Sequence, residues 1–179
     1  MKPRAARLER SIAIHEAGHA VAHYFLREPV VHVTIDQKGD AGGHVRSKRT
    51  FREFRGDETT ARYLKWQARA ERIITIDLCG MVAQTKDDSD TYQSVHGQSD
   101  RDHAVSVAEK VVGCGGSVLD AYLAYRLEVA KAFVDLRWPQ IIAVADALLT
   151  ERMLAWEELQ DVIRESLGIA SFTISRTSG

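Results

Sequence analysis

The feature that most constrains this chain is the pentapeptide His15-Glu16-Ala17-Gly18-His19 inside an apolar-periodic segment. Apolar residues recur at helical spacing over residues 4–27, which predicts a helix that ends before Pro29. Residues four apart lie on one face of a helix, so the imidazoles of His15 and His19 can reach the same metal ion. The sequence therefore predicts a helix here, with two histidines on one face that are able to bind one ion.

The order of residue types in the pentapeptide fits the H-E-x-x-H pattern of zinc peptidases. Two imidazoles supply two of the three protein ligands of a catalytic zinc site. Glu16, beside His15, is the expected general base because its carboxylate can reach a water molecule at the metal. The alternative is an amphipathic helix that carries two ordinary histidines. We expect Zn²⁺ bound by His15 and His19, with Glu16 as the catalytic residue.

The third metal ligand is less well defined by the sequence. A metzincin would place a histidine at position 25, which is Phe25, so that class is excluded. His23 lies about 12 Å along the helix axis from His15, too far for one ion to bind both. The remaining candidates are Glu71, from the next predicted helix, and Asp100, at the start of a later one.

The rest of the pattern predicts a mostly α fold (α+β), with a small antiparallel sheet after the first helix. A strand over residues 31–35 and a return strand over 44–48 form the predicted hairpin. The strand at 31–35 is either an edge open to an extended peptide or an ordinary packed strand. Further helices are expected at residues 59–86, 100–112 (with Ser99 or Asp100 as N-cap), 118–137, 139–153 and 156–167. One domain over residues 1–167 and a frayed tail over 168–179 complete the prediction.

Four segments in the same order resemble the peptidase domain of the FtsH family of ATP-dependent zinc metalloproteases. The most specific of these segments is the motif itself, His15-Glu16-Ala17-Gly18-His19-Ala20-Val21. The other three are residues 30–35 with the following Gly43-His44-Val45, residues 78–84, and residues 97–104. The resemblance implies a zincin-like helical peptidase domain, zinc as cofactor and a polypeptide substrate. It also implies that Asp100, four residues before Ala104, is the third zinc ligand.

The chain also departs from that family. The loop before Asp100 is one residue shorter, which makes Asp102 a second candidate ligand, and His96 and His103 flank Asp100 as candidates for orienting it. The sequence holds no GxxxxGK[ST] phosphate loop. We therefore expect a zinc endopeptidase that cleaves unfolded or exposed segments without its own ATPase. A regulatory protease for one partner and a non-catalytic zinc-binding or assembly module are the alternatives, and the resemblance is compatible with a separate ATPase and with a homo-oligomer.

Composition limits the kinds of partner and the cellular compartment that we expect. With 24 basic and 25 acidic residues, the net charge of -1 gives no electrostatic reason to expect a nucleic-acid partner. No window approaches the ~18 apolar residues of a membrane span, and no signal sequence is recognisable. The two cysteines are too few for a disulfide scaffold. These features predict a cytoplasmic protein.

Overall fold

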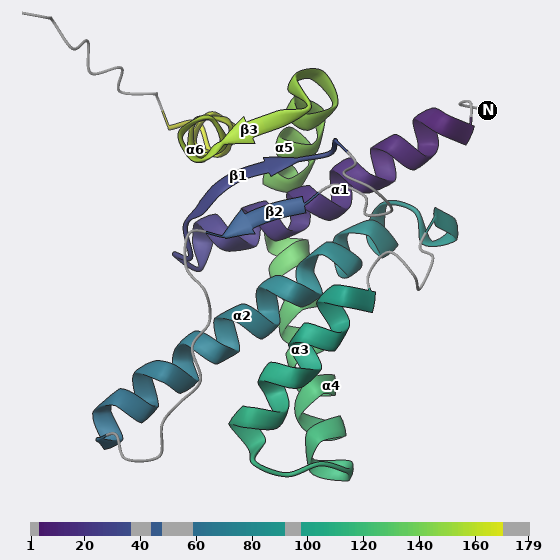
Figure 1. Ribbon diagram of the computed structural model, residues 1–179. Helices are drawn as coiled ribbons and strands as arrows, with labels where there is room; N and C mark the ends of the chain where they lie inside the picture. Colours follow the sequence, from purple (N-terminus) through teal and green to yellow (C-terminus); the bar gives the residue numbers. More distant parts are fainter. Residues whose placement is uncertain (1–3, 37–43, 48–58, 92–97, 170–179) are drawn as a thin grey trace, which may run out of the picture.

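The computed structural model describes residues 4–36, 44–47, 59–91 and 98–169 (Figure 1). Helix makes up 80% of it beside a small three-stranded antiparallel sheet, so the predicted fold class is confirmed. In chain order the elements are α1 (Arg4–Phe25), β1 (Val30–Thr34), β2 (His44–Ser47), α2 (Thr60–Asp87), a 3-10 turn η1 (Ser89–Thr91), α3 (Gln98–Val112), α4 (Ser117–Leu136), α5 (Trp138–Glu151), β3 (Met153–Ala155) and α6 (Trp156–Ser166). None of these helices is long and apolar enough to cross a membrane. Of the predicted tail, residues 170–179 lie outside the described residues.

Helix α1 is the centre of the fold. It packs against α2, α5 and the first two strands, and in Figure 1 it runs between the sheet and α2. Its fully buried apolar residues are small or β-branched, which lets neighbouring helices come close; they are Ala13, Ile14, Ala17, Ala20, Val21 and Ala22. The motif helix is therefore held rigidly from several sides.

Ion pairs hold the two ends of the antiparallel α1–α2 pair. At the start of α1, Arg10 binds Asp87 with an Nη2–Oδ1 distance of 3.0 Å. Just beyond the other end of α1, the buried carboxylate of Glu28 accepts hydrogen bonds from Arg69 and Arg72, which lie in the first half of α2. Because paired charges at both ends specify the register, the middle of α1 faces one defined stretch of α2.

The sheet has the order β2-β1-β3, with β1 antiparallel to both neighbours. The predicted hairpin is confirmed, but β3 was missed because three residues show no measurable period. Val33 pairs with Val45 on one side and with Leu154 on the other, so β1 is central. The suggestion that this strand is an edge open to a peptide is therefore wrong.

Most predicted helix ends agree with the structure within two residues, and two differences have a physical reason. Helix α1 ends at Phe25, and Arg27 takes a left-handed conformation (φ 59°) before the chain turns towards Pro29. Helix α3 begins at Gln98, so Asp100 lies in its first turn and is not the N-cap. This shift leaves the Asp100 side chain available for contacts outside its own helix.

Candidate metal centre

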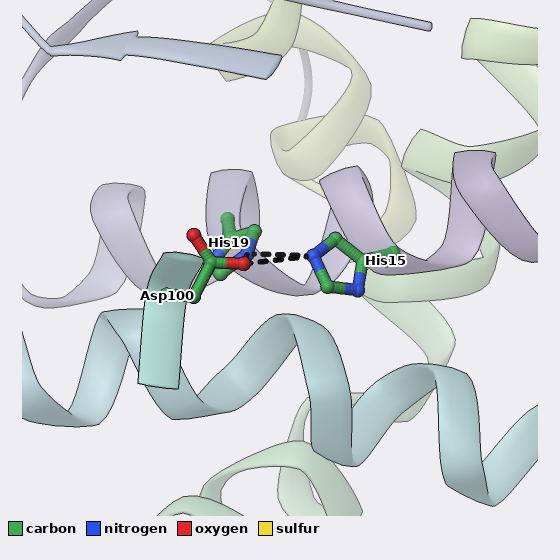
Figure 2. A group of neighbouring side chains, drawn as sticks. All are labelled: His15, His19 and Asp100. Atoms are coloured by element: carbon green, nitrogen blue, oxygen red, sulfur yellow. Dashed lines mark hydrogen bonds and ion pairs between the residues drawn. The ribbon is translucent and has the colours of Figure 1, made fainter. Parts of the chain in front are cut away.

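Three side chains from two helices converge in the middle of the molecule. His15 and His19 come from α1, and Asp100 comes from the first turn of α3 (Figure 2). The two Nε2 atoms lie 3.1 Å apart, and the Asp100 Oδ2 atom lies 3.1 Å from His15 Nε2 and 3.2 Å from His19 Nε2. Both histidines are buried, whereas 31% of the Asp100 side chain is exposed. The three atoms thus form a nearly equilateral triangle that remains open to solvent at one corner.

Helix α2 orients both imidazoles through their other nitrogen. His19 Nδ1 donates to the carbonyl oxygen of Ile76 at 2.8 Å. His15 Nδ1 donates to Gln84 Oε1 at 3.1 Å, and the Gln84 amide is oriented because its Nε2 donates to Ser11 Oγ at 2.8 Å. A proton on each Nδ1 leaves a lone pair on each Nε2, which is the atom that faces Asp100. Both rings therefore present a metal-binding nitrogen to the same point.

Two glycines make this close approach of helices possible. A Cβ atom on Gly80 would lie 2.3 Å from His19 Nε2, and one on Gly18 would lie 2.7 Å from the carbonyl oxygen of Cys79. Both distances are shorter than any relaxed contact between such atoms. Gly18 lets α1 touch α2, and Gly80 leaves the space that the His19 ring occupies.

The triangle is electrostatically incomplete when both histidines are neutral. The two Nε2 atoms and the Asp100 oxygen are then all hydrogen-bond acceptors, so no proton lies between them. Burial lowers the pKa of His19, but the charge of Asp100 and its hydrogen bond outweigh burial and raise that pKa to about 9. Burial likewise raises the pKa of Asp100, yet the positive charge of His19 holds it well below its usual range. Without a metal, a proton on His19 balances the carboxylate; a cation could take its place.

The geometry fits a metal ion. Bonds of about 2.0–2.1 Å to zinc in tetrahedral coordination imply separations of roughly 3.3–3.4 Å between ligand atoms. The observed separations of 3.1–3.2 Å are within a few tenths of an ångström of that value. Among the described residues, His15, His19 and Asp100 are the group that can hold a metal ion.

Glu16 lies next to this group on α1 and is buried. Burial raises the pKa of its carboxyl group, and the charges of His15 and His19 oppose that rise. Asp100 also acts on Glu16 and raises its pKa further. A carboxyl group with this environment is suited to accept and return a proton.

The structure separates the other sequence candidates from the triangle. Glu71 faces Arg126, at 3.5 Å from its guanidinium, and so does not reach the histidines. His23 donates from Nδ1 to the carbonyl oxygen of Glu28 at 2.6 Å and is a packing residue. Asp102 is exposed and outside the group, and His96 lies outside the described residues. His103 donates to Asp77 on α2 at 2.8 Å.

Sequence reasoning missed the part that α2 plays. Ser11, His15 and His19 recur every four residues on α1, and Ile76, Gly80 and Gln84 do the same on α2. Such rows form matching ridges when two helices pack, which explains why these six residues meet. In this row of α2, the positions after Ile76 are a glycine and a glutamine, where a core-facing row would carry large apolar residues. That break in the apolar pattern is the signal that could have indicated a helix face next to a site.

Comparisons with known proteins add no assignment. No protein-family model matches the sequence, and a search of curated proteins finds no match. The resemblance to the FtsH family therefore stays a prediction.

Proposed function

We propose that this protein is a zinc-dependent endopeptidase, as its resemblance to the peptidase domain of the FtsH family implies. The observation that carries the proposal is the convergence of His15, His19 and Asp100 beside the buried carboxyl group of Glu16. Three protein ligands from nitrogen and oxygen donors leave one position of a tetrahedral ion open, as in catalytic zinc sites.

The donor set alone also suits ferrous iron, which binds two histidines and one carboxylate in many oxygenases. Glu16 favours zinc and hydrolysis, because an oxygenase has no need for a buried carboxyl group next to the metal ligands. Metal analysis of the purified protein distinguishes the two ions directly.

In this proposal His15, His19 and Asp100 hold the ion, and Glu16 moves the proton. Bound zinc would supply Lewis acidity, which lowers the pKa of water and polarises a peptide carbonyl. Glu16 accepts one proton from the attacking water while the oxygen of that water bonds to the carbonyl carbon. When the C–N bond breaks, Glu16 returns that proton to the departing amine, so that the enzyme ends in its starting state.

The substrate we propose is an unfolded or exposed polypeptide segment. A separate ATPase that delivers substrates, a homo-oligomer and a cytoplasmic location belong to the same proposal. The two cysteines, Cys79 and Cys114, are free, as expected in a reducing compartment. A regulatory protease for one specific partner is the narrower form of this activity, and comparing unfolded casein with a proteome-derived substrate trap distinguishes the two.

Two variants test the proposal. We expect about one zinc per chain in the untagged protein, lost in His19→Ala, and cleavage of casein that Glu16→Gln abolishes while zinc is retained. A Glu16→Gln protein that cleaves like the wild type would show that the mechanism is wrong. Zinc binding without any cleavage would favour the alternative, a non-catalytic zinc-binding module.

A further inference from the structure

Asp77 and His103 join α2 to α3 immediately beside the metal centre. Asp77 lies on α2 directly after Ile76, whose carbonyl oxygen orients His19. His103 lies on α3 three residues after Asp100. Its Nδ1 atom lies 2.8 Å from Asp77 Oδ2, within the range of a strong charge-assisted hydrogen bond.

We infer that this Asp77–His103 hydrogen bond positions Asp100, because it holds the first turn of α3 against α2 so that Asp100 reaches both histidines. The inference rests on the proposed metal site and extends it to two residues that touch neither the ion nor the substrate. Asp77 and His103 are thus positioning residues.

The first turn of a helix needs such support. Its leading N–H groups have no partner within the helix, so this turn frays more easily than the turns behind it. Asp100 sits in that turn, and its carboxylate must stay about 3 Å from both imidazoles for the triangle to form. His103 is one turn further along on the same face, where i,i+3 neighbours lie together.

The surroundings of the pair show that it is more than a surface ion pair. Only 15% of the Asp77 side chain is exposed, compared with 52% for His103. A largely shielded carboxylate that loses its donor is poorly compensated by water, whereas fully exposed pairs of charges contribute little. The neighbouring Ala104 is fully buried, so this part of α3 packs closely against the core. The Asp77–His103 hydrogen bond then fixes how α3 is rotated about its own axis.

Helix α2 therefore orients all three members of the metal centre. Ile76 orients His19 through its carbonyl oxygen, Gln84 orients His15, and Asp77 acts on Asp100 through His103. Partners of metal ligands commonly change metal affinity by about 10–100-fold when they are removed.

Zinc affinity, measured by competition with a chromogenic chelator, tests the inference in the full chain. We expect His103→Ala to weaken zinc binding about 10–100-fold, and Asp77→Ala to do the same. The double variant should be no weaker than either single one, since both remove the same hydrogen bond. His103→Asn keeps an N–H donor at the position of Nδ1 and should bind within a few fold of wild type. Arg101→Ala, an exposed change in the same turn, is the matched control.

A second measurement does not depend on zinc. Amide hydrogen exchange of residues 102–104 in the metal-free protein should be faster in His103→Ala and near wild type in His103→Asn. Wild-type affinity in His103→Ala, or equal damage in His103→Ala and His103→Asn, would overturn the inference. If the wild type binds no zinc, the proposed function fails, and the exchange data still decide whether this pair holds the first turn of α3.

Discussion

Replacing Gly80 with alanine is the sharpest test of the metal centre, because two physical effects predict opposite results. In the interior of a helix, Gly→Ala normally stabilises a protein by about 1 kcal/mol. At this position the new Cβ atom would lie 2.3 Å from His19 Nε2 and 2.7 Å from two carbons of the ring. Ordinary contacts between such atoms are about 3.5 Å or longer, so the ring must move by roughly 1 Å.

The His19 ring has little freedom to move. Its Nδ1 donates to the carbonyl oxygen of Ile76 at 2.8 Å, so a displacement breaks this bond as well as the triangle with Asp100. Overpacking of this kind costs about 1–3 kcal/mol, which cancels or exceeds the helical gain. Disturbing the orientation of a metal ligand weakens metal binding by about 10–100-fold, and because His19 is itself a ligand we expect zinc affinity to fall by about 100-fold.

Chelator competition for zinc and urea denaturation in EDTA measure the two effects separately. Gly115→Ala is the matched control, because a Cβ atom there meets nothing within 4 Å. We expect the control to bind zinc like the wild type. A Gly80→Ala protein that binds zinc normally and gains stability would refute the described placement of His19 against α2.

Three further changes have defined outcomes. Gln84→Leu removes the acceptor of His15 Nδ1 and should weaken zinc binding about 10–100-fold, whereas Gln84→Glu keeps an acceptor and should stay close to wild type by the same titration. Burial lowers the pKa of His23 from 6.5 to about 4, so the unfolded state binds more protons between these values. Stability should fall by roughly 3 kcal/mol as the pH drops through that window, and urea titrations of His23→Gln should lack this fall. Glu28→Gln removes the buried negative charge that binds Arg69 and Arg72 and should lower the free energy of unfolding by about 3 kcal/mol, while Lys131→Ala, in an exposed pair, should change it by less than about 1 kcal/mol.

Local pattern was enough to predict the helices and the hairpin. Helical periodicity and Pro29 placed α1 within two residues of its observed end, and alternation identified β1. The i,i+4 spacing also placed His15 and His19 on one face of that helix. Each of these properties depends on residues a few positions apart, so a single segment contains all the information required.

Local sequence pattern could not predict which carboxylate lies beside the two histidines. Asp100 is 81 residues from His19 in the sequence, and Glu71 and Asp102 were equally acidic candidates. The answer depends on how α3 packs on α2, and therefore on the buried Ala104 and the ion pairs between helices. The roles of Gly80 and Gln84 and the third strand, β3, depend on packing in the same way. Local periodicity is a property of neighbouring residues, whereas contacts between α1, α2 and α3 arise from close-packed side chains that no one segment specifies.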